Sequence, residues 1–393
     1  MDFDFDALVD RRGTNCQKWD QMAAATGVTA ADALPMWVAD MDFRPPPAVQ
    51  HALEGMIDHG LYGYPGSQSP ATEAVRWWMR TRHGWDVAPE AILTTHGLVN
   101  GTGLCVDSCT EPGEGVVLFT PVYHAFARVI RAAGREVIEC PMPRGADGRY
   151  RMDLEAASAA LPDHARMVML CSPHNPGGRV WSPDELRAVA EFARRHDLIL
   201  ISDEIHHDLV FPGQTHTAMA LAAPGIADRL IMLTAATKTF NIAGAHLGNV
   251  IIPDPALRAR LERRMAALGI SPNAFGLRMV EAAYGAEGAA WVDALMAYLD
   301  GNRRLFDAGV NAIPGLASMP LEGTYLAWVD FAGTGMRPDE IAARVGGAAR
   351  IAASPGPQFG AGGERFMRFN LATQRTNIEA AVARLTEAFG DLQ

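Results

Sequence analysis

The sequence predicts an α/β protein with a large domain, built on a mostly parallel sheet flanked by helices, and a smaller α+β domain. Short runs of apolar residues alternate with amphipathic segments along most of the chain. Each run is apolar at nearly every position, as expected of strands that are buried on both faces. Strands of this kind that alternate with helices form a parallel sheet with helices on each side. The 393 residues are enough for such a domain and a second, smaller one.

Six apolar runs are the predicted strands of the large domain. They lie at residues 91–95, 115–121, 166–173, 197–204, 229–237 and 248–254. Amphipathic segments connect them, and one of these has a clear helix start, with Ser182 as the cap, Pro183 in the first helical position and Glu185 in the third. This alternation defines the predicted large domain, residues 49–285.

The pattern changes after residue 285. Residues 291–310 predict a long helix, and two strand-like segments follow at 322–331 and 364–372, before a last helix. We assign residues 286–393 to a small α+β domain. Residues 1–48 are expected to form an N-terminal segment that joins this small domain.

Composition excludes several classes of function. A net charge of −11 without a run of Lys or Arg argues against a nucleic-acid partner. No run of 18 apolar residues predicts a membrane span, and the acidic N-terminal segment lacks the apolar core of a signal peptide. The five cysteines, an odd number without a CxxC pair, are typical of reduced core thiols rather than of metal ligands. We therefore expect a cytoplasmic protein that binds a small molecule and no metal.

Chemically distinctive residues follow the predicted strands at the point where each strand ends. In open α/β sheets, ligands bind beyond the carboxyl ends of the strands. The residues found there are the Gly turn His96-Gly97-Leu98-Val99-Asn100, Tyr123, Asn175, Asp203 and Lys238. Each one alone is explained by a turn, a loop, a helix cap or a solvated side chain. All five at successive strand ends predict a binding site.

Lysine is rare in this chain, which draws attention to the two that it contains. Of 34 Lys and Arg residues, only Lys18 and Lys238 are lysines. Lys238 lies in TAATKTFNIAG, among small, hydroxyl and apolar residues. An apolar pocket disfavours the charged ammonium, so such an amine is a usable nucleophile that can form a Schiff base.

The other residues at the strand ends fit the same chemistry. A carboxylate such as Asp203 can keep a pyridine nitrogen protonated, which turns the ring into an electron sink. Asn175 can donate a hydrogen bond to a phenolic oxygen, and Tyr123 can stack on the ring. The Gly97 turn, placed before a helix, can bind a phosphate. Together these groups predict a site for pyridoxal 5'-phosphate.

At this point the chain resembles a known family, the fold-type I pyridoxal-phosphate enzymes of the aminotransferase class I/II group. The matching motifs around the site are TKTFNIAG, SDEIHHDL, SPHNPGGRVW and RFMRFNLA. Six further motifs resemble its MalY/PatB-type cystathionine β-lyase, or cysteine C–S lyase, branch. They are DRRGTNCQKWD, LPMWVADMDF, YGYPG, TPVYHAF, EGTYLAW and PGPQFG.

The resemblance implies a role for each matching residue. Lys238, Asp203 and Tyr123 would be catalytic: Lys238 binds the cofactor and moves the substrate Cα proton, Asp203 pairs with the pyridinium, and Tyr123 stacks on the ring. Arg368 would hold the substrate carboxylate with a two-pronged contact that a lysine does not provide. The other implied cofactor contacts are Gly97, Leu98, Val99, Asn175, His206, Thr237 and, from the second subunit of a homodimer, Tyr64. The other implied substrate contacts are Trp37, Val38, Ala39 and Asn175.

The cofactor allows two reactions, and the residues leave both open. The resemblance favours β-elimination from L-cystathionine or another cysteine S-conjugate, which releases a thiol, pyruvate and ammonia. The alternative is a class I/II aminotransferase acting on an amino acid with a neutral side chain, since no second Arg is evident that would select a dicarboxylic substrate. Segments 244–249 (GAHLGN) and 370–375 (NLATQR) depart from the lyase motifs near the substrate. A nicotinamide enzyme is excluded because no GxGxxG follows the first strand.

Overall fold

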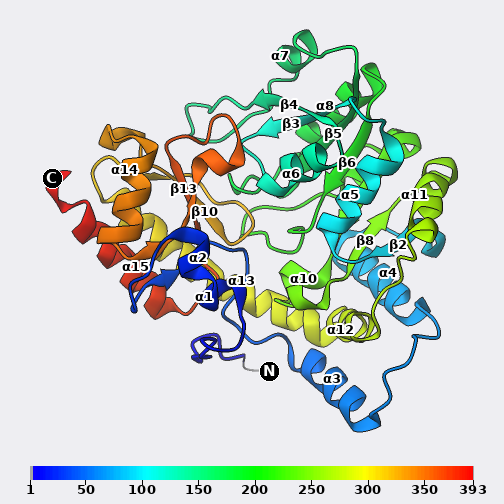
Figure 1. Cartoon of the computed structure of the whole chain (residues 1–393), viewed down its shortest axis with the longest axis horizontal. Helices are drawn as coiled ribbons and strands as arrows, with labels where there is room; N and C mark the ends of the chain where they lie inside the picture. The colour runs from blue at the N-terminus through cyan, green and yellow to red at the C-terminus, as the bar shows by residue number, and fades with distance from the viewer. Residues whose placement is uncertain (1–2, 393) are drawn as a thin grey trace.

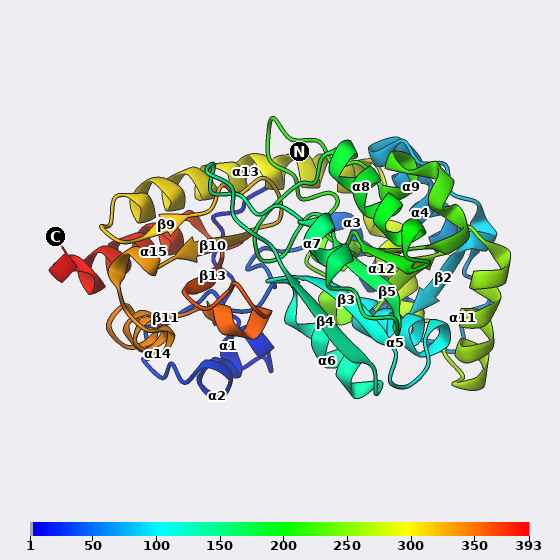
Figure 2. The ribbon, with the colours of Figure 1, turned by 90° about the horizontal axis from the view of Figure 1, so that it is seen from above.

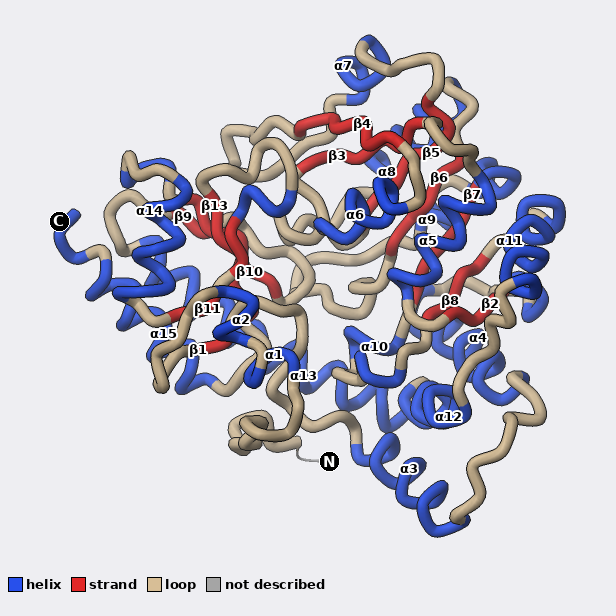
Figure 3. The backbone as a smooth tube through the Cα atoms, viewed as in Figure 1, coloured by secondary structure: helices blue, strands red, loops and turns tan. Residues whose placement is uncertain are grey.

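A seven-stranded sheet lies at the centre of the computed structural model, which describes residues 3–392 (Figures 1 and 3). Its order is β2-β8-β7-β6-β5-β3-β4. Strand β8 runs antiparallel to both of its neighbours, β2 and β7, and the other neighbouring pairs are parallel. The prediction of a mostly parallel sheet is therefore confirmed. The strands are β2 (Ile92–Thr95), β3 (Gly115–Thr120), β4 (Glu136–Pro141), β5 (Ala165–Cys171), β6 (Ile199–Asp203), β7 (Leu230–Thr234) and β8 (Gly248–Ile251).

Strand β4 is an edge strand that the sequence interpretation missed. It pairs only with β3 in the sheet order, and none of its residues is fully buried. An edge strand of this kind has no continuous apolar run, so a search for strands buried on both faces passes over it.

Helices cover both faces of the sheet. Alternate residues of β3 belong to different apolar cores, Val117 and Phe119 to one and Val116 and Leu118 to the other. This alternation places one core on each face. The helices of this part are α3 (Pro47–His59), α4 (Ser69–His83), α5 (Leu98–Cys109), α6 (His124–Ala132), α7 (Leu154–Ala159), α8 (Pro183–Arg195), α9 (Met219–Ala222), α10 (Ala236–Thr239), α11 (Pro255–Ala267) and α12 (Ala274–Ala283).

Helix α8 begins as its sequence predicts. The Ser182 hydroxyl accepts a hydrogen bond from the Glu185 backbone N–H at 3.2 Å, and the Glu185 carboxylate accepts one from the Ser182 N–H at 2.8 Å. This reciprocal pair satisfies two backbone donors that the first helical turn leaves without partners.

A second sheet organises the C-terminal part, with the order β12-β13-β10-β9 and antiparallel pairing (Figure 1). The N-terminal segment joins this part through a parallel pair, β1 with β11. The long helix α13 packs against α15 and β9 (Figure 2). The elements are α1 (Gln17–Asp20), α2 (Met22–Thr26), β1 (Leu34–Pro35), α13 (Ala286–Asn311), β9 (Ala317–Ser318), β10 (Leu326–Asp330), α14 (Pro338–Ala343), β11 (Ile351–Ala352), β12 (Ser354–Pro355), β13 (Phe366–Asn370) and α15 (Arg375–Ala388).

The small α+β part matches the fold class expected from the sequence. The division of the chain at residues 48 and 285 stays a prediction, and one apolar core runs through both parts. Among residues 3–392, no helix has the length and apolar character needed to cross a membrane.

Candidate active site

A cavity of about 730 Å³ opens at the carboxyl ends of the central strands. It gathers residues that are far apart in the sequence but follow β3, β5, β6 and β7 in the fold. Its wall includes every predicted site residue except Tyr64: Trp37, Val38, Ala39, Gly97, Leu98, Val99, Tyr123, Asn175, Asp203, His206, Thr237, Lys238 and Arg368.

Lys238 is placed on the short helix α10, directly after β7. Its Nζ donates a hydrogen bond to the Ala39 carbonyl oxygen at 2.6 Å. Burial lowers its pKa from 10.5 to about 8. The positive charge of Arg368 also lowers this pKa, whereas the negative charges of Asp40 and Asp203 raise it. A neutral, nucleophilic amine is therefore accessible close to neutral pH.

Asp203 ends strand β6 and is 5% exposed. One oxygen accepts a hydrogen bond from the Ile205 backbone N–H at 3.1 Å. Burial raises the pKa of the Asp203 carboxyl to about 7. A cationic ring nitrogen in this cavity would give the carboxylate the partner that it lacks, and would lower this pKa.

A Gly turn leads into helix α5 at one end of the cavity. Gly97 has φ of +79°, a conformation that favours glycine. The first N–H groups of a helix have no intrahelical acceptor, so those of Leu98 and Val99 suit an anion. Strand β8 packs closely against this turn at Gly248. A side chain at that position would be crowded, because its Cβ would lie 3.0 Å from Leu98 N.

Three polar side chains on the cavity wall retain hydrogen-bonding capacity. Asn175 accepts a bond from Arg368 through Oδ1, which leaves its amide N–H groups for another acceptor. Nδ1 of His206 is buried without a partner among the described residues. Burial lowers the pKa of His206 to about 3, so the ring is neutral. Tyr123 is half-buried, and the burial of its phenol raises the pKa of that group.

Arg368, on β13, is a buried cation aimed at the same cavity. It is 3% exposed, and its Nη atoms donate to Asn175 Oδ1 at 2.9 Å and to the Trp37 carbonyl at 2.8 Å. Its Nε has no partner within residues 3–392. Burial lowers the pKa of the guanidinium to about 10, which still leaves it charged at neutral pH. A buried cation without a carboxylate partner is an anion-binding site.

Several residues of α6 line the cavity, and two of them are titratable side chains that the sequence did not single out. His124 and Arg128 lie four positions apart, on one helix face. Burial, with the charges of Arg368 and Arg128, lowers the pKa of His124 to about 4. No second arginine that would select a dicarboxylic substrate is evident from the sequence; the structure places Arg128, an exposed residue, on the cavity wall. Helical spacing alone does not distinguish such a residue from a solvated one.

The atypical GAHLGN segment also reaches the cavity. His246 lines the wall and has φ of +45°, a left-handed conformation that is uncommon outside glycine. Ala245 is buried beside it. The departure from the lyase motifs thus lies in the cavity wall itself.

Tyr64 is not part of this cavity within one chain. It is fully exposed in the loop between α3 and α4, and lines a separate hollow of about 640 Å³. Other exposed apolar side chains, Ile57, Leu61 and Tyr62, lie in the same stretch of chain. The Tyr62 ring contacts that of Phe275 at 5.5 Å between centroids. The one-chain structure does not bring Tyr64 to the other cofactor residues.

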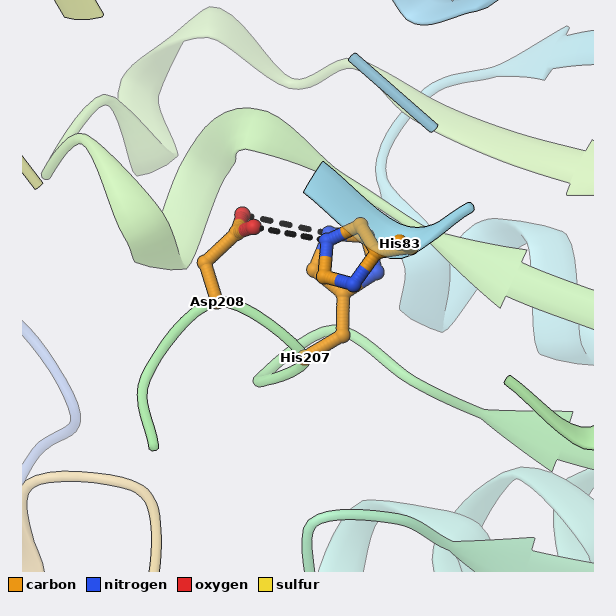
Figure 4. A group of neighbouring side chains, drawn as sticks. All are labelled: His83, His207 and Asp208. Carbon is orange, nitrogen blue, oxygen red and sulfur yellow. Dashed lines mark hydrogen bonds and ion pairs between the residues drawn. The ribbon is translucent and has the colours of Figure 1, made fainter. Parts of the chain in front are cut away.

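A largely buried polar cluster of His83, His207 and Asp208 adjoins Thr239, the residue after Lys238 (Figure 4). The Asp208 carboxylate accepts hydrogen bonds from Thr239 Oγ1 at 2.7 Å and Trp78 Nε1 at 2.9 Å. His83 Nε2 lies 2.8 Å and His207 Nε2 3.2 Å from its oxygens. Through Thr239, the cluster ties down the end of the helix that carries Lys238.

Comparison with known proteins agrees with this geometry. The family model for aminotransferase class I and II matches residues 36–385. The chain is 38% identical to cystathionine β-lyase PatB of Bacillus subtilis, over 98% of this chain and 99% of that protein. Cystalysin of Treponema denticola, solved with pyridoxal 5'-phosphate, has a TM-score of 0.94 and 34% identity, with all of both chains covered. A pyridoxal-phosphate-bound C–S lyase from Staphylococcus hominis has a TM-score of 0.90 and 27% identity, and the match covers 99% of this chain and 98% of that chain. The chain therefore belongs to the aminotransferase class I and II family.

Proposed function

We propose that this protein is a pyridoxal 5'-phosphate-dependent carbon–sulfur β-lyase that converts L-cystathionine or other cysteine S-conjugates into a thiol, pyruvate and ammonia. The main support for the proposal is that Lys238, Asp203 and Arg368 line the same cavity. The relatives named as a cystathionine β-lyase and a C–S lyase support elimination as the reaction.

The side chains of the cavity fit each part of the cofactor. Asp203 suits the pyridine nitrogen, the orphaned His206 Nδ1 suits the phenolic oxygen, and the N–H groups at the start of α5 suit the phosphate. When bound, pyridoxal 5'-phosphate would supply an electron sink that acidifies the substrate Cα–H bond and lets a thiolate leave Cβ.

The residues of the chain would then control binding and proton movement. Arg368 binds the substrate α-carboxylate, and its fixed guanidinium sets the orientation of Cα. The Lys238 amine, with its pKa near 8, accepts the proton from Cα. Asp203 keeps the ring nitrogen charged. The departing sulfur takes the Cβ–S electron pair and then a proton, and water completes the release of pyruvate and ammonia.

The proposed reaction is tested by the product that forms without an acceptor. We expect the purified protein, loaded with pyridoxal 5'-phosphate, to form pyruvate from L-cystathionine with no ketoacid added. A lactate-dehydrogenase-coupled assay measures the pyruvate, and a thiol reagent measures the equimolar thiol. Turnover that requires 2-oxoglutarate or pyruvate as acceptor, and yields no free thiol, would establish the aminotransferase alternative, which the family description also accommodates.

Arg128 is expected to favour substrates with a distal carboxylate. It lines the cavity, and its charge lowers the pKa of both Tyr123 and His124, two other cavity residues. Arg128→Gln should lower kcat/KM for S-(2-carboxyethyl)-L-cysteine by about 2- to 5-fold, in the range of an exposed ion pair. The matched neutral substrate S-propyl-L-cysteine should change less than twofold. Equal losses on both substrates would contradict a role in charge recognition.

We also propose that the active enzyme is a homodimer in which Tyr64 completes the site of the second copy. An exposed apolar patch supports this proposal. It consists of Ile57, Leu61, Tyr62 and Tyr64, and apolar side chains grouped in this way are typical of surfaces that bind another protein. The location of Tyr64 outside its own cavity fits a contact across a subunit boundary.

Hybrid dimers test this arrangement. Lys238→Ala and Tyr64→Ala chains should each be nearly inactive, and mixing them after brief denaturation should restore up to about a quarter of wild-type activity through hybrid sites that are intact. Each variant refolded alone is the control. No recovery in the mixture, or full activity in a monomer by light scattering, would contradict a shared site.

A further inference from the structure

Residues 37–42 form a segment without helix or strand that is held by side chains, and its first four residues, 37–40, line the cavity; we call this segment the strap. Its carbonyl oxygens from Trp37 to Met41 each accept at least one side-chain hydrogen bond. Buried or half-buried carbonyls outside sheets and helices need such partners. The donors to these carbonyls are Arg368 and Ser354 (Trp37), Asn370 (Val38 and Asp40), Lys238 (Ala39), Lys18 (Asp40), and Arg11 and Asn241 (Met41).

Both lysines of the protein therefore donate to neighbouring carbonyls of one strap. Lys238 Nζ lies 2.6 Å from the Ala39 oxygen, and Lys18 Nζ lies 2.8 Å from the Asp40 oxygen. The same strap touches the proposed carboxylate-binding residue, because Arg368 donates to the Trp37 oxygen at 2.8 Å. The strap thus connects Lys18, which is outside the cavity, with the two cations that face the substrate.

Lys18 is fully buried and forms an ion pair with Asp42 at the end of the strap. Its exposure is 0%, that of the Asp42 side chain is 3%, and Nζ lies 2.6 Å from Oδ2. The other Asp42 oxygen accepts a hydrogen bond from Trp19 Nε1 at 3.0 Å. Burial alone would raise the pKa of Asp42, but the charge of Lys18 and these hydrogen bonds outweigh it and hold the pKa below its usual value.

An ammonium suits this place better than a guanidinium. Lys18 Nζ has three donors and finds Asp42 Oδ2 and the Asp40 carbonyl within 2.8 Å. An arginine would bring five donors in a rigid fork into a space with no exposure to water, and would leave several unsatisfied. This requirement gives a physical reason for a lysine at position 18 in a chain that otherwise uses arginine.

We propose that Lys18 is a positioning residue for the substrate site: its ion pair with Asp42 fixes the strap, and the strap in turn fixes Arg368 and Lys238. The inference rests on the proposed function for the identity of the bound carboxylate. Lys18 does not itself line the cavity but contacts it through Asp40, so its loss should weaken substrate binding more than it slows the chemical step.

The test compares Lys18→Met with a core variant of similar stability loss. L-Alanine serves as the probe because it has the α-carboxylate and amine of the substrate but no leaving group, so its binding does not depend on elimination. We expect Lys18→Met to raise the dissociation constant of L-alanine for the cofactor-loaded protein about tenfold, measured by the change in visible absorbance. On a cleaved substrate, KM should rise about tenfold while kcat changes less than threefold. Leu385→Ala, in the buried face of α15, should lower the melting temperature without either change.

A second pair of variants keeps the test decisive if Lys18→Met does not fold. Lys18→Met/Asp42→Leu removes both buried charges, and Arg11, which also pairs with Asp42 at 3.2 Å, keeps its ion pair with Asp40 at 2.7 Å. This double variant should fold and still bind L-alanine about tenfold more weakly, whereas Lys18→Arg should not restore binding. L-Alanine affinity within twofold of wild type in the double variant, or a loss matched by Leu385→Ala, would overturn the proposal. If the protein shows no lyase turnover but Lys18→Met still weakens L-alanine binding about tenfold, only the proposed reaction is contradicted.

Discussion

Lys238→Ala is expected to abolish turnover and the covalent attachment of pyridoxal 5'-phosphate. The reason is that Lys238 is the one amine that lines the cavity among residues 3–392, and the other lysine, Lys18, is fully buried outside it. Visible absorbance before and after borohydride reduction measures the attachment. The wild type should be fixed irreversibly by borohydride, and the variant should lose its cofactor on dialysis. A reducible adduct that survives in Lys238→Ala would contradict the assignment.

The pH dependence of cofactor capture follows from the same residue. Burial lowers the pKa of Lys238 to about 8, so the neutral amine is lost as pH falls through 8 and is present above it. The rate at which cofactor-free protein attaches pyridoxal 5'-phosphate should therefore rise up to about pH 8 and then level. A rate that still rises steeply from pH 9 to 10 would mean that the amine keeps an ordinary lysine pKa.

Arg368→Lys is expected to lower kcat/KM by roughly 10- to 150-fold, equal to about 1.5–3 kcal/mol for a charge-assisted hydrogen bond. Lysine keeps the charge but loses the fork that binds Asn175, the Trp37 carbonyl and a substrate carboxylate at once. Steady-state kinetics on L-cystathionine measure the loss, and most of it should appear in KM.

A neighbouring arginine provides the control for this prediction. Arg365 lies three residues before Arg368 but does not line the cavity. Arg365→Lys should leave kcat/KM within about twofold of wild type. If the two variants lose activity equally, the carboxylate is bound elsewhere and the place of Arg368 in the proposed mechanism is wrong.

The sequence by itself determined the mostly parallel sheet and the polar cavity residues that follow its strands. Double-sided burial leaves continuous apolar runs, and in a parallel sheet the residues after such runs share one edge. This logic locates Tyr123, Asn175, Asp203 and Lys238, and the structure places all four on one cavity wall. Arg368 needed the resemblance, because it lies inside a strand of the second sheet rather than at a strand end.

Only the tertiary structure decided which residues from separate elements complete the site. Arg128 and His246 look like ordinary surface residues in the sequence, and both are exposed in the structure, yet helix α6 and a left-handed backbone place them on the cavity wall. The role of Lys18 was equally hidden, since its ion pair with Asp42 spans 24 positions and joins irregular backbone. Local periodicity records which face of an element is buried. It does not record which distant element packs against that face. The packing of distant elements sets the position of the strap, the positions of Arg368 and Lys238, and the shape of the cavity.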